Sequence, residues 1–114
     1  MTSPITTHVL DTARGAPGAG IHVTLDVESA PGTWTRVGEG TTDPDGRLRT
    51  LLAAGALRTA AYRIAFDAGP YFAAQGTECF WRTVVIEFVV RDAAAHYHVP
   101  LLVSPYGYST YRGS

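Results

Sequence analysis

Hydrophobic and polar residues alternate along several segments of the chain. The clearest is residues 21–28, where Ile21, Val23, Leu25 and Val27 alternate with polar side chains. Successive side chains of a β-strand point to opposite faces, so this period of two predicts a strand with one buried face. The remaining predicted strands are 5–10, 33–39, 47–52, 62–67, 84–90, 97–103 and 106–112.

Glycine, proline and aspartate separate the predicted strands. Residues 15–20 predict a loop, and residues 31–32 and 43–46 predict tight turns. One helix is expected over 67–76, because Pro70 suits the first turn of a helix and the glycine at its end suits a stop. Short strands joined by such turns indicate an all-β, antiparallel sandwich.

Composition limits the possible functions. The 114 residues suffice for one domain, 1–114, and 46% hydrophobic with 17% charged residues is typical of a globular chain. A net charge of −1 gives no electrostatic reason to expect a nucleic-acid or membrane partner. The single cysteine, Cys79, excludes an internal disulfide, and the first residues do not look like a signal peptide. We therefore expect a cytoplasmic protein.

Strand parity predicts one outward face that carries reactive side chains. Ile5 and Val9 suit the core, so His8 should face outward, and the same reasoning applies to Arg47 next to Leu48. The full outward set is His8, Arg47, His98, Ser109 and Tyr111, together with the apolar Leu10, Pro100 and Leu102. Because this face is partly apolar, we expect a second subunit to cover it.

The other histidines have simpler interpretations. His22 shares a strand face with Thr24, Asp26 and Glu28 and is expected to be solvated. His96 and His98 share a strand face and are conceivable metal ligands, but zinc would need one or two more, and Cys79 is isolated. We expect no metal and no cofactor.

The chain ends in an unusual way. Tyr111-Arg112-Gly113-Ser114 follows a β-rich run directly, without a polar tail, and lies downstream of the His-x-His pair. Chain ends are usually frayed and tolerant of change. A phenol, a guanidinium and a hydroxyl held by a strand therefore predict a functional site with a defined geometry.

The residues that carry these features resemble the 5-hydroxyisourate hydrolases, the transthyretin-related enzymes of urate breakdown. The resemblance runs through residues 6–11, 45–48, 71–72 and 96–114, and the terminal tetrapeptide is its most specific part. One segment, Phe80-Trp81-Arg82-Thr83, departs from the family pattern.

The resemblance implies a transthyretin-like β-sandwich of about eight strands with one short helix. It implies a hydrolase that opens the ring of 5-hydroxyisourate to 2-oxo-4-hydroxy-4-carboxy-5-ureidoimidazoline, without metal. The assembly implied is a homotetramer, a dimer of dimers, with active sites in a channel between dimers. The residues carried over as catalytic or substrate-binding are His8, Arg47, His98, Ser109, Tyr111, Arg112 and Ser114.

Ring opening adds water to a ring carbonyl, which needs a base and a positive group near the developing oxyanion. His8 and His98 are both candidate bases, and Arg47 is the candidate cation. Tyr111 would orient the substrate or line the pocket. Ser114 would hold one tautomer of a histidine or position Arg112. The alternatives are a transthyretin-like small-molecule carrier, which needs no histidine pair with an arginine, and an immunoglobulin-like adhesion module, which predicts surface recognition loops.

Overall fold

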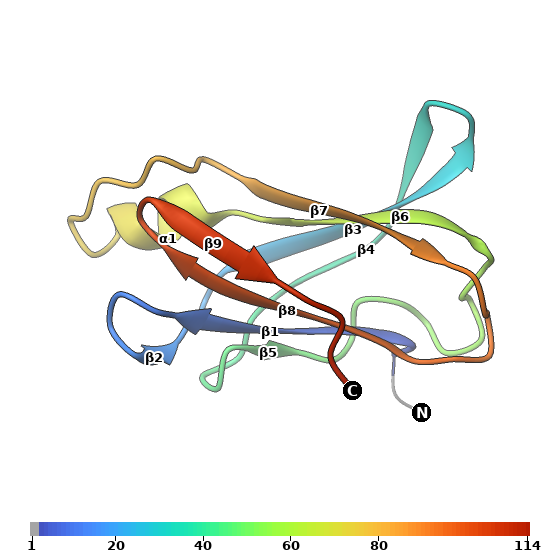
Figure 1. Cartoon of the computed structure of the whole chain (residues 1–114), viewed down its shortest axis with the longest axis horizontal. Helices are drawn as coiled ribbons and strands as arrows, with labels where there is room; N and C mark the ends of the chain where they lie inside the picture. The colour runs from blue at the N-terminus through green and yellow to red at the C-terminus, as the bar shows by residue number, and fades with distance from the viewer. Residues whose placement is uncertain (1–2) are drawn as a thin grey trace.

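A computed structural model describes residues 3–114 as two β-sheets packed face to face, with a short helix at one end (Figure 1). The first sheet has the order β2-β1-β8-β9, with β5 also paired to β1. The second sheet has the order β4-β3-β6-β7. The strands of the first sheet are β1 (Ile5–Asp11), β2 (Ala16–Pro17), β5 (Arg47–Leu48), β8 (Tyr97–Ser104) and β9 (Gly107–Thr110). Those of the second are β3 (His22–Ala30), β4 (Thr33–Thr41), β6 (Ala60–Phe66) and β7 (Val84–Val90), and the helix is α1 (Ala68–Ala73).

The core lies between the two sheets and consists of the alternating apolar residues. Val23, Leu25 and Val27 of β3 are fully buried, as are Ile64 and Phe66 of β6. Burial of one face of each strand is the reason why the period of two predicted the strands correctly. The β-sandwich with one short helix is thus confirmed. Within residues 3–114, no helix is long and apolar enough to cross a bilayer.

Several elements are shorter than their predicted ranges. The predicted strand 47–52 is a strand only over Arg47–Leu48, and the predicted helix 67–76 is a helix only over Ala68–Ala73. The predicted loop 15–20 instead contains a short strand, β2. The predicted strand 106–112 is β9, which ends at Thr110. β9 ends there because Pro100 in the neighbouring strand β8 has no N–H to donate to the ladder. Pairing resumes in the same register at a bridge between His98 and Gly113.

One strand pair departs from the predicted antiparallel arrangement. β1 and β8 are parallel, with Thr6 opposite His98 and His8 opposite Pro100. These two strands come from opposite ends of the chain, and they lie side by side in the middle of the first sheet (Figure 1). Their register brings the histidines of both ends to one face, because residues opposite each other in a sheet share a face.

Candidate active site

The turn that precedes β5 fixes the position of Arg47. The carboxylate of Asp43 accepts hydrogen bonds from the backbone N–H groups of Asp45 and Arg47, each 2.9 Å long. The Arg47 N–H bond is the main reason why the pKa of Asp43 is lowered. Gly46 has a φ of +78°, and a Cβ there would lie 2.4 Å from the carbonyl oxygen of Val9. Only glycine fits this turn, which starts β5 at Arg47.

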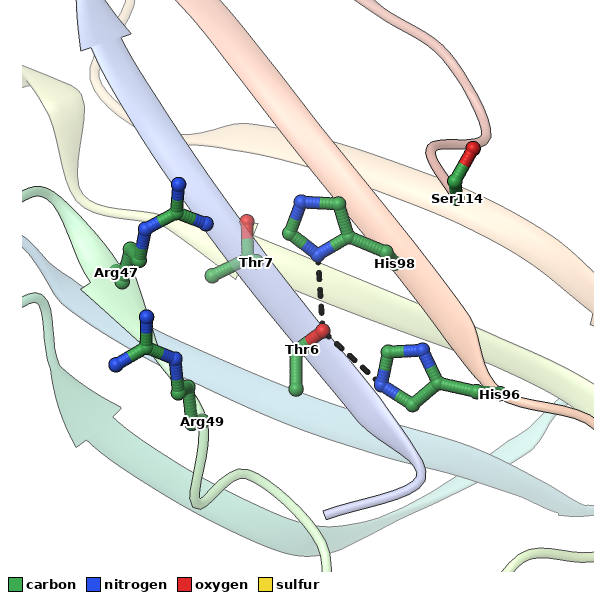
Figure 2. A pocket seen from close by; sticks show the side chains of 7 residues that line it. All are labelled: Thr6, Thr7, Arg47, Arg49, His96, His98 and Ser114. Atoms are coloured by element: carbon green, nitrogen blue, oxygen red, sulfur yellow. Dashed lines mark hydrogen bonds between the residues drawn. The ribbon is translucent and has the colours of Figure 1, made fainter. Parts of the chain in front are cut away.

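A pocket of about 380 Å³ opens on the outward face where β1, β5, β8 and the chain end meet. Figure 2 shows two arginines on one side of β1 and two histidines on the other. Among residues 3–114, the side-chain ion pairs involve only His22 and Asp26 with their partners, so neither pocket arginine forms an ion pair with a carboxylate side chain. The pocket is therefore suited to a polar, electron-rich ligand. Its lining residues are Thr6, Thr7, Arg47, Arg49, His96, His98 and Ser114.

His98 is the titratable group whose environment is best suited to accepting a proton. Its Nδ1 lies 2.9 Å from the hydroxyl of Thr6. Burial lowers the pKa of His98, and the nearby Arg47, His96 and His8 lower it further, because each disfavours the charged imidazolium. The ring is consequently neutral near pH 7, which is the state a general base requires.

The terminal residues pack onto both sides of β8. The N–H of Gly113 donates to the carbonyl oxygen of His98 over 2.8 Å, and a Cβ on Gly113 would lie 2.6 Å from Cδ2 of the His98 ring. The guanidinium of Arg112 lies 4.4 Å from the ring centre of Tyr97 and donates to the carbonyl oxygen of His96. The tail thus holds the His98 ring from one side, and only glycine fits next to it. Gly113 also lies against Pro100, so this outward proline is buried within the single chain.

The structure brings some of the predicted site residues together and separates others. Arg47, His98 and Ser114 line the same pocket. His8 lies opposite Arg47 in the sheet, and its Nε2–H donates to the carbonyl oxygen of Asp45 over 3.0 Å, which leaves Nδ1 as its free nitrogen.

The other three predicted residues lie away from this pocket, and His8 is not among its lining residues either. Ser109 pairs with Leu102 further along the sheet. Tyr111 and Arg112 line a second pocket of about 270 Å³, together with Tyr97 and Val99. In the single chain, Arg112 holds the tail in place, and neither it nor Tyr111 forms part of the pocket around His98.

Four pocket residues were not among those predicted for the site: Thr6, Thr7, Arg49 and His96. Thr6 lies two residues before His8, so parity was sufficient to place it on the same face, but its partner His98 follows only from the parallel β1–β8 pair. Arg49 follows Arg47 by two residues, and it too lines the pocket. His96 was considered only as a metal ligand. In the described part of the chain, no three His, Cys, Asp or Glu side chains are arranged to hold a metal ion.

His22 is exposed, as predicted, but it is not simply solvated. Its Nε2 lies 2.9 Å from Glu39 of β4, and its Nδ1 lies 3.0 Å from Asp67, which precedes α1. The hydrogen bonds to Glu39 and then Asp67 raise the pKa of His22. Both partners are distant in sequence, so the alternation within 21–28 could not reveal them.

Comparison with known proteins agrees with this fold and site. The model of the HIUase/Transthyretin family matches residues 5–113. A 5-hydroxyisourate hydrolase from Caulobacter vibrioides is 47% identical over 117 residues, which cover 98% of this chain and 99% of the relative. The chain therefore belongs to the HIUase/transthyretin family. Membership of this family argues against the alternative that the chain is an immunoglobulin-like adhesion module.

Two solved structures show both branches of the family. The 5-hydroxyisourate hydrolase of Klebsiella pneumoniae has a TM-score of 0.83 and 32% identity, with all of both chains covered. Sea bream transthyretin in complex with thyroxine has a TM-score of 0.91 and 28% identity, covering 96% of this chain and 94% of its own. The backbone is thus similar to both branches, and the side chains of the site must distinguish them.

Proposed function

We propose that this protein is a 5-hydroxyisourate hydrolase of urate breakdown, which opens the ring of its substrate by adding water to a ring carbonyl. The observation that carries the proposal is the shared pocket of Arg47 and a half-buried His98 whose pKa is lowered. A neutral imidazole and a permanent cation are the two groups that carbonyl hydrolysis requires. The high identity to the Caulobacter hydrolase supports the same function.

In the proposed mechanism, His98 takes the proton from the attacking water. Arg47 then stabilises the negative charge that develops on the carbonyl oxygen, with Arg49 at the same side of the pocket. His8 lies beside this pair, with Nδ1 free to bind substrate. Ser114 lines the pocket and contributes a hydroxyl. The reaction needs no metal or cofactor, because the pocket supplies both the base and the cation.

Tyr111, Arg112 and Ser109 have less direct roles in this proposal. Arg112 acts through the tail, since its contacts with Tyr97 and the His96 carbonyl hold Gly113 against His98. Tyr111 is 58% exposed, and Ser109 also lies on the surface of the single chain. Both reach a substrate only if a neighbouring subunit extends the pocket across the outward face.

Such an assembly, a dimer of dimers, forms part of the proposal. The outward face exposes Leu10, and β7 and β9 are the end strands of their sheets and leave backbone groups unpaired. Edge strands and an apolar face are two separate reasons for association, which suits a tetramer with two kinds of interface. Light scattering at micromolar concentration should give a tetramer, and a monomer would contradict this part of the proposal.

The carrier alternative is tested together with the hydrolase. The likeness to sea bream transthyretin supports a common backbone, but a carrier has no need of a neutral histidine beside two arginines. Freshly generated 5-hydroxyisourate should lose its ultraviolet absorbance much faster with the protein than in the spontaneous reaction. A decay rate equal to the spontaneous rate at every protein concentration would overturn the proposed hydrolase.

A further inference from the structure

The hydroxyl of Thr6 lies between the two histidines of the pocket. Its oxygen is 2.9 Å from Nδ1 of His98 and 3.2 Å from Nε2 of His96, and Figure 2 shows both contacts. The side chain is buried, with Thr6 only 7% exposed. A hydroxyl has one proton, so it can donate to only one of the two ring nitrogens, and at least one of them must carry a hydrogen and donate to it. The proton positions on the two imidazoles are therefore linked through Thr6.

The neighbouring threonine shows that this arrangement is specific. Thr7 donates its hydroxyl to the carbonyl oxygen of Val99 over 2.6 Å, so its polar group is used within the backbone of the sheet. Thr6 pairs with His98 across the same two strands, but its hydroxyl bonds only side chains of the pocket. The Thr6 hydroxyl bonds two imidazoles and does not add to the hydrogen bonds of the β-ladder. Its effect is therefore on the two histidines.

Arg47 determines which of the two directions the chain of hydrogen bonds takes. In Figure 2 the other nitrogen of His98, Nε2, lies on the side of the ring that faces Arg47. A guanidinium offers only donors, so a bare nitrogen beside it is favoured over an N–H. With Nε2 bare, Nδ1 carries the proton of neutral His98, and this N–H donates a hydrogen bond to the hydroxyl of Thr6. Thr6 then donates to His96, whose Nε2 accepts.

We propose that Thr6, oriented by His96, is a positioning residue that selects the tautomer of His98 with a bare Nε2 facing the pocket. This inference rests on the proposed hydrolase, because only a bare Nε2 takes a proton from the attacking water. Thr6 and His96 touch neither water nor substrate in this role. They act through His98, as an orienting group acts on the histidine of other hydrolytic sites.

The first test compares Thr6→Val with Thr6→Ser. Valine keeps the shape but removes the hydroxyl, and we expect kcat to fall ~10- to 100-fold, the usual cost of losing an orienting partner, with KM little changed. Serine keeps the hydroxyl and should retain activity within about twofold, since the hydrogen bonds survive. His96→Phe removes the acceptor but keeps an aromatic ring, and should give a smaller fall in kcat. Thr24→Val, the same change on the other sheet, is the matched control. Unchanged kcat in Thr6→Val, or a loss that Thr6→Ser shares, would overturn the inference.

The second test reads the tautomer directly and needs no substrate. Imidazole ¹⁵N NMR of the whole protein above the pKa of His98 should show Nδ1 protonated and Nε2 bare, and His96→Phe should weaken this preference. A wild-type His98 with the proton on Nε2 would overturn the inference, even if Thr6→Val fails to fold. If the tautomer is as expected but the wild-type protein leaves 5-hydroxyisourate unchanged, the proposed hydrolase fails instead.

Discussion

His98 and His22 lie on strands of opposite sheets, and their surroundings shift their pKa values in opposite directions. His98 is half-buried among Arg47, His96 and His8, and its pKa is lowered. His22 is exposed between Glu39 and Asp67, and its pKa is raised. His98 loses its proton more readily and keeps a nitrogen for chemistry, while His22 retains its proton to higher pH and has both nitrogens occupied. The surroundings of a histidine, and not its presence on an outward strand face, decide whether it can act as a base.

Replacing Arg47 by glutamate should have the largest effect. The change removes the cation for the oxyanion and puts a carboxylate near His98, which would raise its pKa and make its surroundings resemble those of His22. We expect kcat/KM to fall about 10³-fold, the upper range for losing one stabilising donor, while the melting temperature changes little. Arg58→Glu, the same charge change at an exposed loop residue, is the control. Substantial activity in Arg47→Glu would show that the oxyanion is stabilised elsewhere.

The two histidines themselves should differ by a large factor. His98→Asn removes the proposed base and should lower kcat by roughly 10²-fold or more. His22→Asn should leave kcat within about twofold, because its ring faces away from the pocket on the other sheet. Turnover measured under the same conditions for both variants decides the matter. Equal losses of kcat in the two variants would show that the surroundings of His98 and His22 do not determine which histidine acts in catalysis.

Gly113→Ala should disturb the His98 pocket without changing its chemistry. The added Cβ would lie 2.6 Å from the His98 ring, so the ring or the tail must move. A displacement of this size typically costs up to roughly 10²-fold in rate, and we expect a fall of about 10-fold. Gly107→Ala in β9 is the matched control, because its Cβ would meet only the Ser104 hydroxyl at 3.6 Å. Full activity in Gly113→Ala would mean that the tail does not hold His98.

The smallest expected effect is on stability and concerns His22. Because its folded-state pKa is raised, its ion pairs stabilise the fold fully below about pH 6.5, the unfolded value, while both carboxylates stay charged. This contribution is lost as pH rises through the folded pKa. His22 is 46% exposed, so we expect less than about 1 kcal/mol in the free energy of unfolding. Urea unfolding of wild type and His22→Gln should differ below this window and converge above it, and a difference that grows with pH would contradict the assignment.

The sequence predicted the layers of this fold better than its connections. Alternation located β3, β6, β7 and β8 to within two residues at each end, because it reports one buried face of each strand. It could not reveal that β1 and β8 pair in parallel, since pairing joins residues more than 90 positions apart. Cytoplasmic location and a single domain over 1–114 stay predictions.

The same limit applied to the candidate site. Parity correctly brought His8, Arg47 and His98 to one face, but it gave no partners, so Thr6 and Arg49 were overlooked. Arg112 was assigned to the substrate because of the family resemblance, although the groups it contacts in the single chain are Tyr97 and a backbone carbonyl. Contacts of this kind depend on register across strands, which a pattern within one strand does not contain.

The pH dependence of kcat/KM tests most directly whether neutral His98 is the base. Decay of 5-hydroxyisourate should be followed from about pH 5 to pH 8, a range that spans the ordinary histidine pKa, with the spontaneous rate subtracted. Because a base works only when unprotonated and the pKa of His98 is lowered, we predict that activity declines on acidification with its midpoint below pH 6.5. A decline with its midpoint above pH 6.5 would contradict the assignment of His98, and so would activity that rises as pH falls.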